Sequence, residues 1–238
     1  MKRCNFIGSL FVPTLLCVTF SVNATLVSRL GGQAVYDTDL DITWISDVNL
    51  ASTNTFGIPE GTGGIFNPGG NMSWDTANNW IDAINAANYL GFNDWRMPLT
   101  ASLDSTCNDN PGGGGSADAQ GFDCTGGEMG HLFYDELGGT GATSILNSSD
   151  PDVALFSNIT ISGGQHWSGT EFSSSSAWVF GIEGTGGSGQ QVHALKGNNF
   201  SVLPVRDGDV GAVPIPAAIW LFGFGLMCMV GVVKRKKV

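Results

Sequence analysis

Three aspartates at alternating positions could bind a metal ion. Asp37, Asp39 and Asp41 stand in the segment Asp37-Thr-Asp-Leu-Asp41, and carboxylates at the first, third and fifth positions of a loop can converge on calcium. However, Ile42 stands where an EF-hand loop has glycine, and no glutamate occupies the twelfth position. A hairpin turn explains the three aspartates equally well. The segment is therefore a candidate calcium site, with a turn as the alternative.

Cysteine chemistry is limited to one pair in the middle of the chain. Cys107 and Cys124 bracket a glycine-rich segment, whereas Cys4, Cys17 and Cys228 lie in apolar stretches near the two ends. In an oxidising compartment such a pair most simply forms a disulfide. A reactive thiol or redox pair is the alternative, but the spacing is not Cys-X-X-Cys and no cation stands nearby to lower a thiol pKa. We predict a disulfide between Cys107 and Cys124.

No other residues form a recognisable catalytic set. The three histidines, His131, His166 and His193, include no pair four residues apart, so the sequence lacks a helical zinc motif. It also lacks a Gly-x-Ser-x-Gly elbow, and its 21 carboxylates do not single out one acid–base pair. We predict that the protein is not an enzyme, and a hydrolase is the less favoured alternative.

A tryptophan near a serine-rich loop is the candidate for a glycan contact. Trp167 and Glu171 precede the loop at residues 173–176, and an aromatic face can stack on a sugar ring. The sequence favours a core position for Trp167 over this contact, because the residue opens a strand-like segment. In so acidic a chain, Arg96 and Arg206 are expected to pair with carboxylates and not to contact a ligand.

Charge is distributed very unevenly along the chain. Of the 10 cationic side chains, six lie at the extreme ends, whereas all 21 carboxylates lie between Thr25 and Val213. That middle segment holds only four cations and carries a net charge of −17. So acidic a body repels phosphate backbones, which excludes a nucleic-acid partner.

The two ends are typical of export and membrane insertion. Residues 1–24 combine Lys2 and Arg3, a short apolar run and Val22-Asn-Ala24, which is the pattern of a secretory signal peptide. Residues 215–233 are uncharged and, at ~1.5 Å per helical residue, long enough to span a bilayer. The basic segment that follows is expected to stay cytoplasmic, which leaves the acidic body in the periplasm. We therefore predict an exported precursor anchored in the inner membrane, which later reaches the cell surface or the extracellular space.

The C-terminal segment resembles a known class of sorting signal. It reads Val213-Pro-Ile-Pro-Ala-Ala-Ile-Trp-Leu-Phe-Gly-Phe-Gly225 and resembles the VPxPA-WLFGxG form of the PEP-CTERM signals. The resemblance implies a Gram-negative producer of exopolysaccharide, a transient stay in the inner membrane and cleavage by an exosortase-type transpeptidase. The prolines fit, because they keep the backbone extended where a protease needs access. The residues that carry the motif are Val213, Pro214, Pro216, Trp220, Gly223 and Gly225.

Two helices and several short strands are expected in the body of the chain. Ser73 fits the N-cap of a helix whose apolar residues recur at helical spacing until Gly91, and residues 128–137 form a second amphipathic stretch. Strands are expected at residues 33–36, 42–45, 177–182 and 200–206. Pro204 places the last strand at a sheet edge or a bulge. Together with long glycine-rich loops, these elements favour an antiparallel α+β domain.

The same segments are similar to the Lcl C-terminal domain family. The most specific matching pieces are Asp94-Trp-Arg-Met-Pro98 and Trp167-Ser-Gly-Thr-Glu171. The resemblance implies a C-type-lectin-like fold of the formylglycine-generating-enzyme superfamily, with Trp95 in the core and Arg96 paired internally. It also implies a surface binding domain with family precedent for adhesion to glycans or host matrix. Copper-dependent oxidation of the superfamily kind is not expected, because the two cysteines lie outside the matching motifs.

These patterns divide the chain into three segments and favour one function. We expect a signal peptide at 1–24, a lectin-like domain at 25–211 and a sorting signal with a transmembrane helix at 212–238. The favoured function is an exported adhesin-like or lectin-like protein that binds extracellular polysaccharide. A structural protein of the biofilm matrix without a small ligand is the alternative. Calcium is the one cofactor that the sequence suggests.

Overall fold

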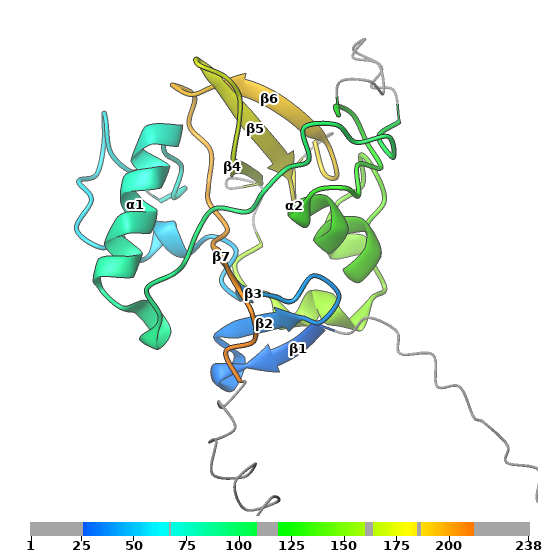
Figure 1. The fold of residues 1–238 in the computed structure, drawn as a ribbon, viewed down its shortest axis with the longest axis horizontal. Helices are drawn as coiled ribbons and strands as arrows, with labels where there is room; N and C mark the ends of the chain where they lie inside the picture. Colours follow the sequence, from blue (N-terminus) through cyan, green and yellow to red (C-terminus); the bar gives the residue numbers. More distant parts are fainter. Residues whose placement is uncertain (1–25, 67, 109–118, 160–163, 185–186, 212–238) are drawn as a thin grey trace, which may run out of the picture.

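The described strands form two antiparallel sheets (Figure 1). A computed structural model of the chain describes residues 26–66, 68–108, 119–159, 164–184 and 187–211. The predicted signal peptide, membrane span and sorting motif lie outside these ranges. The first sheet has the order β1-β2-β3-β7 and the second the order β4-β5-β6. Their bounds are β1 (Leu26–Arg29), β2 (Ala34–Asp37), β3 (Ile42–Ile45), β4 (Gln165–Ser173), β5 (Ser176–Gly181), β6 (Gln191–Leu195) and β7 (Val205–Asp207).

Helix α1 (Trp74–Ala86) begins where the sequence predicts. Ser73 is its N-cap, and the hydroxyl accepts a hydrogen bond at 3.3 Å from the backbone N–H three residues further on. The predicted end at Gly91 is wrong. Asn88 adopts a left-handed conformation with φ of 52°, which cannot continue a right-handed helix. The rest of the predicted run therefore forms a separate short 3-10 turn.

The second predicted helix has two parts. Helix α2 (Glu128–His131) leads directly into a π-helix (Leu132–Glu136). The backbone N–H of Leu137 donates to the carbonyl of Leu132 at 3.0 Å, which is the five-residue spacing of a π-turn. Helical structure over this stretch is therefore confirmed, whereas the widened turn was not expected.

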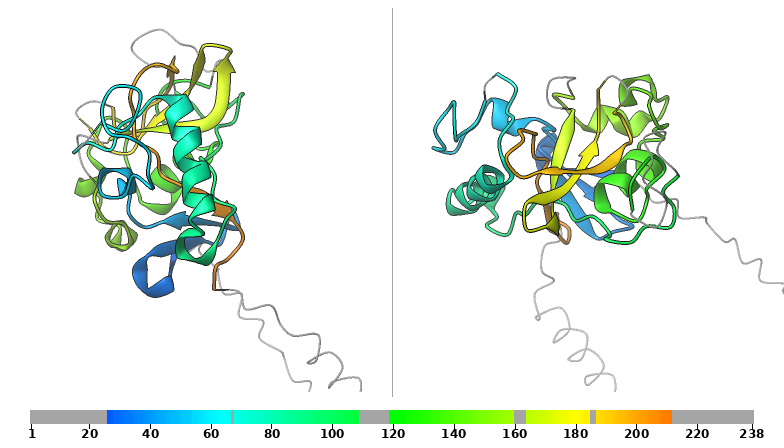
Figure 2. Two further views of the ribbon diagram at one scale, coloured as in Figure 1. Left: turned by 90° about the vertical axis from the view of Figure 1, so that its left-hand side faces the viewer. Right: turned by 90° about the horizontal axis from the view of Figure 1, so that it is seen from above.

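Strands β3 and β5 are buried on both faces, with a helix on each side of the molecule (Figures 1 and 2). Phe180 of β5 belongs to a core cluster with Leu132 and Phe133 of the α2 side. Its neighbour Val179 belongs to a second cluster that contains Trp80 of α1. Because successive residues of a strand point to opposite faces, one strand supports both cores. The predicted α+β class with short antiparallel strands and two α-helices is confirmed for the described residues.

The first and last strands of the described domain lie in the same sheet. Strands β1 and β7 form its two edges, so the predicted edge position is confirmed, whereas the predicted strand at 200–206 is shorter and begins only after Pro204. Arg29 at the end of β1 pairs with Asp209 just after β7, with Nε and Oδ1 2.8 Å apart. This ion pair holds the two ends of the domain together. Among the described residues, no helix is both long and apolar enough to cross a membrane.

Candidate functional site

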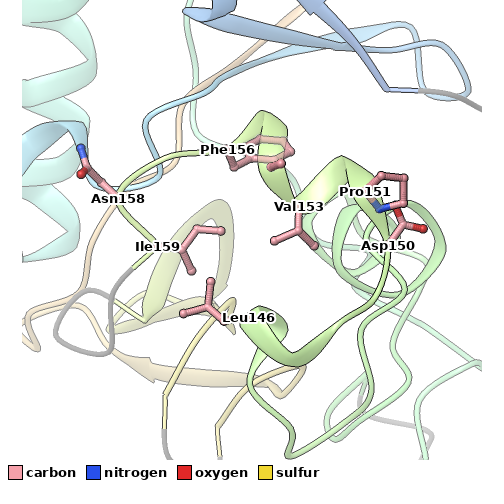
Figure 3. Close-up of a pocket in the computed structure, with 8 residues that line it drawn as sticks. Leu146, Asp150, Pro151, Val153, Phe156, Asn158 and Ile159 are labelled. Atoms are coloured by element: carbon pink, nitrogen blue, oxygen red, sulfur yellow. The ribbon is translucent and has the colours of Figure 1, made fainter.

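A shallow hollow opens between two short 3-10 turns in the segment 145–159 (Figure 3). Its volume of about 630 Å³ falls in the range of roughly 300–1,000 Å³ that small-ligand sites occupy. Most of its wall is apolar, and polar side chains stand at opposite ends. The labelled residues are Leu146, Val153, Phe156 and Ile159 in the middle, Asp150 with Pro151 at one end and Asn158 at the other.

Buried polar contacts fix the turns that shape this hollow. Glu183 is 4% exposed, and its Oε2 accepts hydrogen bonds from the hydroxyl of Ser144 at 2.8 Å and the backbone N–H of Ile145 at 3.0 Å. At the second turn, Asp150 is the N-cap, and its Oδ1 accepts a hydrogen bond from the backbone N–H of Asp152 at 2.9 Å. Proline follows the cap at the first helical position, where its fixed φ is favourable. The hollow therefore has a preformed wall.

A second, smaller hollow of about 230 Å³ adjoins the same 3-10 turn. The turn Ile145–Asn147 contributes Leu146 to the apolar hollow and Asn147 to the polar one. The side chains that line the polar hollow are Thr140, Thr143, Ser144, Asn147, Ser148 and Ser149. Hydroxyl and amide groups both donate and accept hydrogen bonds, so they can pair with the hydroxyls of a sugar.

These two hollows together fit the chemistry of carbohydrate binding. A sugar ring presents apolar C–H faces and a rim of hydroxyls, and the segment 138–159 offers an apolar wall beside hydroxyl and amide side chains. Among the described residues that line the hollows, Asp150 is the one carboxylate. The arrangement therefore offers both kinds of contact that a sugar ring makes, apolar stacking and hydrogen bonding.

The three aspartates of the predicted calcium loop form a turn between β2 and β3. Asp37 Oδ1 accepts hydrogen bonds from the backbone N–H groups of Asp39 and Leu40, both at 3.0 Å. Asp41 Oδ1 accepts one from the hydroxyl of Tyr36 at 2.7 Å. These are the contacts of the turn alternative, and the three carboxylates are not gathered within 4.8 Å of one another. Calcium binding by this set stays a prediction.

The second oxygen of Asp37 instead faces a histidine and a glutamate of the helix that begins with α2. His131 Nε2 lies 3.8 Å from Asp37 Oδ2 and 3.3 Å from Glu136 Oε1. Asp37 is completely buried, and Glu136 is 5% exposed. Burial raises the pKa of the Glu136 carboxyl, the nearby Asp37 carboxylate adds to the rise, and His131 opposes it.

Trp167 is a core residue, as the favoured interpretation of the sequence expects, and its ring is not available for the glycan contact that was the other candidate role. The side chain is completely buried, and its Nε1 donates a hydrogen bond to the carbonyl of Met72 at 2.8 Å. The ring also packs edge-to-face on Phe200, with the centroids 4.9 Å apart. A buried ring has no face to offer a sugar. Glu171 remains at the surface, where its Oε2 lies 3.1 Å from Lys196 Nζ.

Arg96 and Arg206 pair with carboxylates, as predicted. Arg96 donates from Nη1 and Nη2 to the two oxygens of Glu128 at 2.8 and 2.7 Å and also contacts Asp207. Arg206 makes a bidentate pair with Asp94 at 2.7 and 2.8 Å. The hydrogen bonds from Arg206 lower the pKa of the Asp94 carboxyl. Both arginines therefore act in the scaffold, where they connect β7 with α2 and with the loop before Arg96.

The predicted disulfide between Cys107 and Cys124 is present. Together with Ala119, it forms a small buried cluster around Trp178 of β5. The disulfide therefore attaches this loop to the second sheet. The predicted sorting-motif residues lie beyond Gly211, outside the described part of the chain.

Sequence reasoning missed the hollows and the role of Glu136. The segment 138–159 is rich in Ser, Thr, Asn and Asp and reads only as a loop. The one local pattern in this segment that predicts structure is Asp150 followed by Pro151, which is typical of the start of a short helix. The sequence does not indicate that Glu136 lies beside His131, because the two are five residues apart and only the π-turn brings them together.

Comparison with known families gives a match over most of the described domain. The model of the family described as the Lcl C-terminal domain matches residues 33–206. This range includes both helices, strands β2 to β6, both hollows and the disulfide. A search of curated proteins gives no match, and a search of solved structures gives none.

Proposed function

Because the chain belongs to the Lcl C-terminal domain family, we propose that it is a surface-associated protein that binds carbohydrate without transforming it. The binding site is the pair of hollows in the segment 138–159. One observation carries this assignment: an apolar wall and a polar hollow share one 3-10 turn, which Glu183 holds in place from within. A preformed wall spares the ligand much of the cost of ordering the loop.

Charge restricts the class of carbohydrate. Between Thr25 and Val213 the chain carries a net charge of −17, and such a surface repels sulfated or uronate polymers unless divalent cations bridge the two. The apolar wall suits the uncharged C–H face of a sugar ring. The proposed ligand is therefore a neutral extracellular polysaccharide.

The proposed cellular route rests on the sequence patterns of the two ends. We propose export through the signal at 1–24, transient anchoring in the inner membrane by 215–233, and release by an exosortase-type transpeptidase at the motif that begins at Val213. The C-type-lectin-like fold and the formylglycine-generating-enzyme superfamily are proposed on the separate resemblance of the body of the chain to the Lcl C-terminal domain family. The match to the Lcl C-terminal domain family concerns residues 33–206, the domain that this route would export.

A glycan array with a matched pair of variants tests the binding site. Leu146 borders the apolar hollow and is 56% exposed, whereas Leu195 on β6 is 61% exposed and lies outside it. Leu146→Asp places a charge on the apolar wall and is expected to reduce binding of neutral glycans at least about tenfold, a loss of roughly 1.4 kcal/mol. Leu195→Asp adds the same charge elsewhere and should retain binding.

The array also separates the alternatives. Absence of binding to any neutral or acidic glycan, with or without EDTA, would contradict the proposed function. An equal loss in both variants would show that overall charge, and not the hollow, decides binding. Self-association detected by sedimentation without any sugar would support the matrix alternative.

A further inference from the structure

We propose that Asp37, His131 and Glu136 form a binding site for one divalent transition-metal ion of the zinc type. The site joins the end of β2 to the helix that begins with α2 and continues as the π-helix (Figure 1). The ligand atoms are Asp37 Oδ2, His131 Nε2 and a carboxylate oxygen of Glu136, and they lie within 4.8 Å of one another. This site is separate from the hollows, and it does not depend on the proposed carbohydrate function.

Two buried atoms at the site lack hydrogen bonds. Asp37 is completely buried, and the turn uses its Oδ1, while Oδ2 makes no hydrogen bond within the described residues and has His131 Nε2 3.8 Å away. His131 Nε2 is also buried without a hydrogen bond, although it lies 3.3 Å from Glu136 Oε1 and 3.8 Å from Asp37 Oδ2. Buried polar atoms without partners destabilise a fold. A cation between these atoms would satisfy all three side chains.

The π-helix is what places Glu136 at the site. In a regular α-helix of about 3.6 residues per turn, a side chain five positions on points away from the first. The widened turn Leu132–Glu136 instead brings Glu136 Oε1 to 3.3 Å from the Nε2 of His131, which lies five residues earlier. π-Turns are rare in proteins, but those that occur are frequently found at functional sites. The π-turn therefore brings the side chains of His131 and Glu136 together.

A further carboxylate orients the histidine. Asp135 Oδ2 lies 3.1 Å from His131 Nδ1. Because a carboxylate only accepts hydrogen bonds, Asp135 would hold the proton on Nδ1 when a metal ion is bound, and Nε2 would then be the ligand atom. The same carboxylate–histidine–metal arrangement fixes the ring and raises its basicity in known zinc sites. Asp135 is therefore a positioning residue.

The donor set selects the class of metal. Calcium and magnesium take oxygen ligands almost exclusively, whereas imidazole combined with carboxylates suits zinc and neighbouring transition metals. Two ligands at about 2.0 Å from a tetrahedral zinc lie about 3.3 Å apart, which is the observed separation between His131 Nε2 and Glu136 Oε1. Two carboxylates and a neutral imidazole balance the charge of a divalent ion. Asp39 adds further negative potential at Glu136.

The burial of the ligands points to a structural role. Asp37 lies in the first sheet, and His131 and Glu136 lie far along the chain on the helix beside it. A bound ion would fasten the β2–β3 turn to that helix, because it binds only when the two are together. The partly exposed side of His131 offers the entry path.

Calorimetric titration of the full 238-residue chain, stripped of metal and purified in a non-ionic detergent, tests the site with zinc chloride as the probe. We expect one zinc ion per chain, and binding at least about 30-fold weaker in Glu136→Gln and His131→Gln. Asp135→Asn should weaken zinc binding by about 10- to 100-fold, as losses of outer ligands do. Asp39→Asn removes one charge from the same turn without removing a ligand, and it should change the affinity less than about threefold.

Thermal unfolding distinguishes a lost ligand from a lost fold. In EDTA, Glu136→Gln should unfold at or above the wild-type temperature, because it replaces a buried, poorly compensated carboxyl by a neutral amide. With excess zinc, the wild type should become the more stable protein. The proposal is overturned if the wild type binds no zinc, if Glu136→Gln and His131→Gln bind it as tightly as the wild type, or if Asp39→Asn weakens binding as much as they do.

Discussion

Mild acid should destabilise the folded domain through one buried histidine. His166 on β4 is completely buried, and its Nε2 donates a hydrogen bond to the carbonyl of Val48 at 3.1 Å. Burial lowers the pKa of His166 from its ordinary value of 6.5 to about 4, while hydrogen bonds to backbone carbonyls partly oppose this shift. The fold therefore accepts the neutral ring and excludes the charged one.

The sign and size of the effect follow from proton linkage. Between the two pKa values the unfolded chain binds more protons than the folded chain, so stability falls as the pH falls. The contribution of His166 is fully present above pH 6.5 and is progressively lost as the pH approaches about 4. At about 1.36 kcal/mol per pKa unit, the loss between pH 7.5 and pH 5 is about 2 kcal/mol.

Urea unfolding of the wild type and of His166→Gln at pH 7.5 and pH 5 measures this loss. The glutamine variant is expected to be less stable at both pH values, but it lacks the titrating ring. The wild type should therefore lose about 2 kcal/mol more than the variant on acidification. Carboxylates such as Asp94 and Asp209, whose pKa values are lowered by arginine partners, contribute equally to both proteins. Equal losses in the two proteins would refute the reasoning.

Three further predictions concern the scaffold. Replacing Cys107 and Cys124 by serine opens a loop with a separation of 17 residues and should lower the free energy of unfolding by roughly 3 kcal/mol; a change below about 1 kcal/mol in urea unfolding would contradict the entropic role. Gly130→Ala places a Cβ in a steric clash with the carbonyl oxygen of Cys124 and should cost at least about 1–3 kcal/mol, whereas Gly197→Ala meets no atom within 4 Å and should be nearly neutral by the same measurement. Glu183→Ala removes the acceptor that holds the 3-10 turn Ile145–Asn147, so it should both lower the melting temperature and weaken glycan binding. Unchanged glycan binding would contradict the assignment of this turn to the binding site.

Local signals in the sequence predicted much of the scaffold. Ser73 before an apolar periodic run specifies the start of α1 by capping chemistry alone. Arg96 and Arg206 could be assigned to ion pairs, because a scarce cation in an acidic chain finds carboxylate partners. The disulfide followed from the presence of two cysteines in the body of the chain. These features depend on residue type and on near neighbours.

Features that depend on distant partners could not be predicted. The sequence around Trp167 would look the same whether the ring faced a ligand or the core. Its burial depends on contacts with Met72 and Phe200, which are distant in the sequence. The end of α1 depends on the left-handed conformation of Asn88. The site around His131 depends on a π-turn, which a periodicity of 3.6 residues cannot reveal. The hollows depend on a buried contact between Glu183 and a loop nearly forty positions earlier.

The central claim is that the segment 138–159 binds carbohydrate, and NMR titration tests it most directly. The isotope-labelled protein would be titrated with the neutral glycan that binds best on the array. The structure predicts that the amide signals that shift belong to residues around the two hollows, with Leu146 and Val153 among them. Shifts confined to another surface, such as β6 around Leu195, or the absence of any shift at saturating glycan, would contradict the claim.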